Sequence, residues 1–145
     1  MAAGVMLAVG VSSDRTGERF FHASACAALA ALGCVCAALL PHPLARVAGL
    51  ALVSIGVHAF YAPFWCVPTA LLRGTAAAAG IALVGSLGHL GGFVGPYVLG
   101  LLTDTTGSTT AALLGLASLA LTAAALCFVL RRQAALASHG PQFEA

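Results

Sequence analysis

Four apolar stretches, each long enough to cross a lipid bilayer, constrain this sequence more than any other feature. They lie at about residues 20–40, 44–66, 76–102 and 110–130. A helix rises 1.5 Å per residue and needs about 20 apolar residues to span the hydrocarbon core of a membrane. Charged residues make up only 7% of the chain, whereas soluble domains carry about 25%. The sequence therefore predicts an all-α integral membrane protein with four transmembrane helices.

Short segments rich in proline, glycine or threonine separate the predicted spans. Pro41-His42-Pro43 lies between the first two, and residues 103–108 (TDTTGS) lie between the last two. Glycine and proline are the residues that most often mark turns. The third span is long and contains Pro96, so we expect a kink or a tilt there. Residues 20–132 are predicted to form the membrane segment and residues 133–145 a cytoplasmic tail.

The first twelve residues, MAAGVMLAVGVS, are apolar but too few to cross a bilayer. A signal peptide would begin with basic residues and end at a cleavage site with small residues, and neither is present here. We expect residues 1–12 to be the end of a transmembrane helix that begins outside this sequence. Residues 13–19 are predicted to follow it as a cytoplasmic loop.

The arginines predict the orientation of the chain. If the loops between the four spans alternate between the two sides of the membrane, Arg46 is the only arginine on one side. The arginines that share the other side are Arg15, Arg19, Arg73, Arg131 and Arg132. Positive residues are enriched in cytoplasmic loops, so a multi-pass protein of the inner (plasma) membrane with a cytoplasmic C-terminus is predicted. The absence of lysine and the abundance of alanine indicate a bacterial origin.

Enzymatic activity, metal binding and nucleic-acid binding are not predicted. The sequence has no G-x-S-x-G, H-E-x-x-H or P-loop motif. Its five histidines are dispersed, and its five cysteines form no C-x-x-C pair. The net charge of +2 is too small to attract nucleic acid. We expect no catalytic residue, no cofactor and no metal.

Four of the ten charged residues gather within the stretch SSDRTGERFFH, residues 12–22. A charged loop between two membrane helices can simply fix their orientation. It can also act as a latch, because an acidic side chain can interact with the positive end of a helix and an arginine can bridge to a partner. Glycines at positions 10 and 17 allow close approach and a tight turn.

The segment GVSSDRTGER resembles a loop motif of the major facilitator superfamily, Gly-x-Leu-x-Asp-Arg-x-Gly-Arg-Arg. The residues that match it are Gly10, Asp14, Arg15, Gly17 and Arg19. Ser12 replaces the usual Leu or Met, and Glu18 replaces the first of the two basic residues. The form SDRTGER followed by aromatic residues is similar to the anion:cation symporter branch, whose members move organic acid anions together with a coupling cation.

Residues 64–107 resemble the tenth and eleventh helices of that branch. The matching segments include Phe64-Trp65, Pro68-Thr69, residues 74–82 and residues 91–97. The resemblance covers nearly the whole chain and implies that it is the C-terminal third of a twelve-helix transporter, the four spans being the ninth to twelfth helices. It also implies cation-coupled symport of small carboxylate anions, with a proton or sodium ion as the coupling ion. Such a fragment is expected to be inactive alone.

The resemblance also implies a substrate cavity, at positions that carry polar or aromatic side chains within the spans. The residues predicted to line it are Tyr61, Trp65, Ser86 and His89. As alternatives, Tyr61 and Trp65 are membrane-interface anchors, and the nearby His58 is a helix–helix hydrogen-bonding residue. The branch usually reads Ile-Asn-Ser-x-Gly-Asn where this chain reads VGSLGH at residues 84–89. The loss of both asparagines indicates a substrate site that is altered or lost.

Small residues recur along the third span and predict close helix packing. The residues of this predicted packing face are Gly88, Gly91, Gly92, Gly95, Pro96 and Gly100. Their partner would be the bilayer together with missing transporter helices, or another copy of the chain. The alternative function is therefore a free-standing small membrane protein that acts as an oligomeric interaction or regulatory module.

Overall fold

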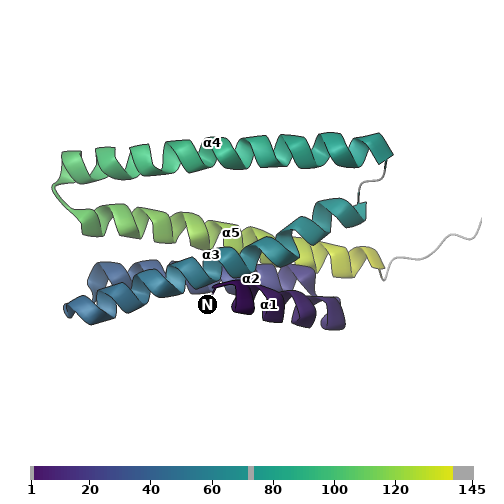
Figure 1. The fold of residues 1–145 in the computed structure, drawn as a ribbon, viewed down its shortest axis with the longest axis horizontal. Coiled ribbons are helices and arrows are strands. Elements are labelled where there is room, and N and C mark those ends of the chain that lie inside the picture. The colour runs from purple at the N-terminus through teal and green to yellow at the C-terminus, as the bar shows by residue number, and fades with distance from the viewer. Residues whose placement is uncertain (1, 72–73, 139–145) are drawn as a thin grey trace, which may run out of the picture.

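The computed structural model describes residues 2–71 and 74–138, and in these ranges it contains helices joined by short connections and no strands (Figure 1). They are α1 (Ala2–Thr16), α2 (Arg19–Leu39), α3 (Pro43–Leu71), α4 (Gly74–Thr106) and α5 (Thr109–Ser138). The last four are long and apolar enough to cross a membrane. The prediction of an all-α chain with four potential membrane spans is confirmed. Arg73 and residues 139–145 of the predicted tail lie outside the described residues.

Proline and glycine set the boundaries of these helices, as the sequence indicates. Pro43 is the first residue of α3, a position where its missing N–H costs no hydrogen bond. Gly107 follows α4 with φ of +63°, a conformation that glycine adopts without steric cost. The Ser108 hydroxyl then accepts a hydrogen bond from the Ala111 N–H (3.4 Å) at the start of α5.

The first helix extends further than the boundary at residue 12 that we expected. α1 continues to Thr16, so that Ser13 and Asp14 are helical and only Gly17 and Glu18 separate it from α2. The Thr16 hydroxyl donates a hydrogen bond to the Ser12 carbonyl (2.9 Å) within the last turn. Gly17, with φ of +68°, then ends the helix and donates its N–H to the Ser13 carbonyl. Most of the predicted loop is therefore the last turn of a helix.

The second helix is the centre of the bundle. α2 packs against α3 and α5, while α1 lies against α3 (Figure 1). The buried side chains of α2 are almost all alanine, cysteine or glycine. The Ser24 hydroxyl donates to the Ala124 carbonyl of α5 (2.9 Å), and the Thr110 hydroxyl of α5 donates to the Ala38 carbonyl (3.4 Å). These two bonds join α2 and α5 near both ends of α2.

Three glycines allow α2 and α3 to approach each other backbone to backbone. A Cβ atom placed at Gly56 would lie 2.7 Å from the Ala30 nitrogen and 2.8 Å from the Cys26 carbonyl oxygen. One at Gly33 would lie 2.7 Å from the Gly49 carbonyl oxygen, and one at Gly49 would lie 2.7 Å from the Ala37 nitrogen. Such separations are too short for any side chain. The α2–α3 contact therefore requires glycine at all three positions.

The predicted packing face of α4 has no close neighbour among the described residues. A Cβ atom placed at Gly88, Gly91 or Gly100 would have nothing within 4 Å, and the same holds for Gly92 and Gly95. No residue of α4 is buried, and Figure 1 shows this helix along one side of the bundle. α4 continues through Pro96 without a break. Close packing of this face therefore stays a prediction that needs a partner outside the described residues.

Replacing Gly56 with alanine should destabilise the protein by about 1–3 kcal/mol, the usual cost of overpacking. The new Cβ would collide with the backbone of α2, and α3 would have to move away. The matched change Gly100→Ala should be neutral or stabilising by up to about 1 kcal/mol, since alanine is the better helix former. Unfolding by SDS in mixed micelles, followed by circular dichroism, measures the change in the free energy of unfolding for both variants. Equal effects of the two changes would contradict the packing described here.

Candidate functional site

Two groups of polar residues stand out in the bundle, and the first is a charged cluster where four helices meet. Glu18, directly before α2, accepts two hydrogen bonds from Arg131 near the end of α5. Their lengths are 2.5 Å from Nε to Oε2 and 3.1 Å from Nη2 to Oε1. The Arg131 guanidinium also lies 5.1 Å from the centre of the Phe21 ring. A two-point contact of this kind fixes the orientation of both side chains.

Arg19, the first residue of α2, extends the charged cluster to α1 and α3. Its Nη2 lies 3.8 Å from the Asp14 carboxylate, and its Nη1 donates to the Cys66 carbonyl of α3 (3.2 Å). Two of the five residues predicted for the loop motif, Asp14 and Arg19, are therefore in contact. Gly10 faces Ala62 of α3, while Arg15 is exposed.

His22 completes this region with a chain of two hydrogen bonds. Its Nδ1 lies 2.8 Å from the Glu18 carbonyl oxygen, and its Nε2 lies 3.0 Å from the Ser12 hydroxyl. A carbonyl oxygen can only accept, so Nδ1 carries the hydrogen and the Nε2 of the neutral ring accepts from Ser12. The end of α1 is thereby joined to the first turn of α2.

The hydrogen bonds from Arg131 lower the pKa of the Glu18 carboxyl below its ordinary value. A carboxyl whose pKa is lower in the folded state than in the unfolded state stabilises the fold above its unfolded pKa. That contribution is lost as the pH falls through the lowered folded-state pKa. The Glu18–Arg131 bridge is therefore intact at neutral pH and weakens only in acid.

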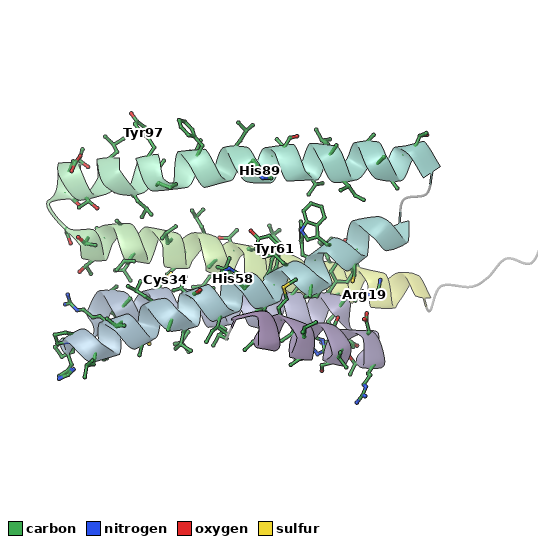
Figure 2. All side chains as sticks on the ribbon, viewed as in Figure 1. Arg19, Cys34, His58, Tyr61, His89 and Tyr97 are labelled. Atoms are coloured by element: carbon green, nitrogen blue, oxygen red, sulfur yellow. The ribbon has the colours of Figure 1, made fainter. Side chains whose placement is uncertain are left out.

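The second group lines a cavity of about 450 Å³ between α3 and α4. Three of the four predicted cavity residues, Tyr61, Trp65 and His89, line it. Figure 2 shows Tyr61 and His89 on the facing sides of α3 and α4. The fourth, Ser86, lines an adjoining open hollow on α4 together with His89. The structure thus brings together most of the residues that were predicted to share a site.

Helical spacing explains how the cavity is built. Tyr61 and Trp65 are four residues apart on α3, so both face α4. On α4, the residues that face them recur at intervals of three or four and are Gly85, Gly88, His89 and Gly92. A Cβ atom placed at Gly85 would lie 3.8 Å from the Trp65 ring. The glycines therefore form a smooth wall opposite an aromatic one.

The aromatic wall includes a residue that was not predicted for the site. Phe64 lines the cavity, and its ring centre lies 5.4 Å from that of Trp65 and 5.2 Å from that of Phe60. Gly85, Gly88 and Gly92 were not predicted as lining residues either. Gly88 and Gly92 belong to the packing face that the recurrence of small residues at helical spacing predicts, whereas Gly85 stands where the family usually has an asparagine.

The polar atoms of the cavity are few. His89 Nδ1 lies 2.7 Å from the Gly85 carbonyl oxygen one turn earlier in α4. His58, whose ring centre lies 6.5 Å from that of Tyr61, bonds in the same way to the Ser54 carbonyl (2.7 Å) and does not line the cavity. In the described part of the chain, no group of three or more His, Cys, Asp or Glu side chains could hold a metal ion. The lining is therefore largely apolar, and its polar side-chain groups belong to Tyr61, Trp65 and His89.

Comparison with known proteins relates the chain to bacterial transporters. It is 45% identical over 120 residues to a protein named as a tartrate transporter from Agrobacterium vitis. It is 41% identical over 108 residues to a quinolone resistance transporter from Acinetobacter baumannii, and 38% identical over 119 residues to the inner membrane transport protein RhmT from Escherichia coli K12. These alignments cover 83%, 74% and 82% of this chain. None of the three is named as an enzyme.

The chain spans only about a quarter of the length of these relatives, namely 27%, 25% and 28%. No protein-family model and no solved structure matches it. The predicted resemblance to a transporter segment is confirmed by the relatives.

Replacing Glu18 with glutamine should destabilise the protein at neutral pH and have less effect in acid. The amide cannot form the charged bridge to Arg131, and the wild-type carboxylate loses that bridge when it is protonated. Unfolding in SDS mixed micelles at pH 7 and at pH 3 measures the difference between variant and wild type. The control is Asp14→Asn, which removes a longer and more exposed ion pair and should have the smaller effect at pH 7. A Glu18→Gln effect that is equal at both pH values would contradict the role of the bridge.

Proposed function

Since the chain belongs to a family of bacterial membrane transporters and carries motifs of the major facilitator superfamily, we propose that it forms part of a carrier for small organic anions. The observation that carries this proposal is the 45% identity over 83% of the chain. Four apolar helices and transporter relatives support a multi-pass membrane protein. In this proposal the chain supplies helices to a larger transporter, as the matching segment does in each relative.

The cavity between α3 and α4 is the proposed substrate site. Carriers bind their substrates near the middle of the membrane, between helices, and this cavity lies between two helices that are long enough to span. Polar residues inside a membrane span mark binding sites or ion pathways by default. We propose that His89 and Ser86 contact the polar end of the substrate and that Tyr61 and Trp65 contact its body.

The substrate class is proposed from the relatives and from the motif. Tartrate, which the Agrobacterium protein is named for, is a dicarboxylate, and the SDRTGER form resembles the anion:cation symporter branch. We therefore propose cation-coupled symport of carboxylate anions, with a proton or sodium ion as the partner.

The charged cluster is the proposed gating latch of the carrier. Its contacts join α1, α2, α3 and α5 at one end of the bundle. Helices that must separate and rejoin during transport can be held by charged contacts that form in only one state. We propose that this end faces the cytoplasm, with the protein in the inner membrane. Arg15, Arg19, Arg131 and Arg132 lie at this end, whereas Arg46, which donates to the Leu40 carbonyl (2.8 Å), is the one described arginine near the opposite end. This excess of positive charge supports the orientation.

The smooth face of α4 is proposed to pack against transporter helices that are not part of this chain. Gly91, Gly95 and Gly100 have open space around them and do not line the cavity between α3 and α4, and close packing of small residues is a usual way for membrane helices to associate. A second copy of this chain on the same face is the alternative. In that alternative, the chain is a free-standing small membrane protein that acts as an oligomeric interaction or regulatory module.

A chimaeric transporter tests the proposed function. The segment of the Agrobacterium tartrate transporter that matches this chain over 120 residues would be replaced by the corresponding residues of this chain. We expect cells that express the chimaera to take up labelled tartrate. Within the chimaera, Trp65→Ala should lower uptake by about tenfold or more, since Trp65 is half-buried in the cavity wall and the loss of an aromatic anchor at a binding site costs about 2 kcal/mol.

The control in the same chimaera is Leu44→Ala. Leu44 lies at the start of α3, is 72% exposed and does not line the cavity, so its loss should leave uptake within about twofold, as expected for a surface substitution. A chimaera that reaches the membrane in normal amounts and takes up no tartrate would contradict the proposal.

A further inference from the structure

The cavity between α3 and α4 contains no permanent positive charge, although it is the proposed site for an anion. None of the described arginines lines it. Arg19 and Arg131 belong to the charged cluster, and Arg46 bonds to the Leu40 carbonyl near the opposite end of the bundle. Among the residues that line the cavity, His89 is the one whose side chain can become positively charged.

The hydrogen bond made by His89 decides what this side chain presents to a ligand. Nδ1 lies 2.7 Å from the Gly85 carbonyl oxygen, which can only accept, so Nδ1 carries a hydrogen. In the neutral ring Nε2 then holds a lone pair and no hydrogen. A lone pair repels a carboxylate oxygen, whereas the same nitrogen becomes a charged donor when it takes up a proton.

We propose that His89 binds the substrate anion together with one proton, so that anion and proton enter the cavity as a pair. This inference rests on the proposed function and names the coupling ion of that site. In the bound state Nδ1–H still donates to Gly85, and the new Nε2–H donates to the anion. The one bond that forms is Nε2–H, with a proton taken from the solvent. For a monovalent anion, the charge of protonated His89 plus ligand is then zero.

The surroundings of His89 favour such a neutral pair. An unpaired charge is costly to hold among apolar groups, but a hydrogen-bonded pair of opposite charges costs much less. On the α3 side, the cavity that His89 lines is bounded by Tyr61, Phe64 and Trp65. No residue of α5 lines this cavity, and no described carboxylate does either. His58, beside Tyr61, is the nearest further imidazole on α3, and its Nδ1 is bonded to the Ser54 carbonyl.

Trp65 makes the proposal measurable, since it is the only tryptophan in the chain and lines the cavity. The full chain would be reconstituted in lipid nanodiscs and titrated with benzenesulfonate while Trp65 fluorescence is followed with excitation at 295 nm. A sulfonate keeps its negative charge at every pH used and brings no proton of its own. Its aromatic ring suits the apolar walls of the cavity.

We expect the Kd for benzenesulfonate to rise at least tenfold between about pH 5.5 and about pH 8, because binding linked to one proton weakens by up to tenfold per pH unit. The variant His89→Arg, which carries a permanent charge, should bind with nearly the same affinity at both pH values. The variant His89→Gln should bind weakly at both. The control His58→Gln should keep the wild-type pH dependence, since His58 does not line the cavity. Circular dichroism shows whether each variant is folded.

The possible negative results of this titration contradict different parts of the proposal. Wild-type binding with equal affinity at both pH values would overturn the role of His89 and leave the proposed substrate site intact. A pH dependence that persists in folded His89→Gln would overturn it as well. A folded wild-type chain whose Trp65 fluorescence responds to neither benzenesulfonate nor tartrate at any pH would instead contradict this cavity as an anion site in the chain alone. Uptake by the chimaera tests the carrier function separately.

Discussion

The backbone contact between α2 and α3 is the interaction on which the rest of the bundle depends. Gly33, Gly49 and Gly56 let the two helices lie closer than any side chain would permit. Lipid chains are as apolar as leucine, so burial of apolar surface does not drive helices together in a membrane, and close packing has to do so. α5 then packs on α2 through alanines and two hydrogen bonds. α1 and α4 are attached to this core from outside.

The two polar regions use this core in different ways. The charged cluster joins helix ends, and the contacts of Arg19 and Arg131 link residues that lie on different helices. The cavity instead lies between the core helix α3 and the loosely attached α4. One wall of the proposed site therefore belongs to the closely packed α2–α3 pair, and the other belongs to a helix with no buried residue. That combination suits a carrier, which must bind its substrate and later release it.

Much of the fold was predictable, because spans in lipid have a required length and composition. The four potential spans, the breaks at Pro41 to Pro43 and near Gly107, and the sharing of a cavity by Tyr61, Trp65 and His89 followed from length, spacing and resemblance. The bridge from Glu18 to Arg131 did not, because nothing in the sequence pairs residues 113 positions apart. The many glycines of α4 predicted a packing face there. The close backbone contact, between α2 and α3, instead involves the more widely spaced Gly33, Gly49 and Gly56. A sequence shows which residues are small but not which of them faces a neighbouring helix.

The close contact between α2 and α3 has a consequence for biosynthesis. α2 and α3 are consecutive and only residues 40–42 separate them, so their contact closes a very short loop. Alanine and glycine have no side-chain rotamers to lose when such a contact forms. Local pairing of this kind is fast compared with contacts between distant segments. The hairpin can therefore assemble as soon as both helices have left the ribosome and entered the bilayer, well before α5 is translated. α5 can then pack on a preformed α2–α3 pair. The bridge between Glu18 and Arg131 forms only after α5 has been synthesised.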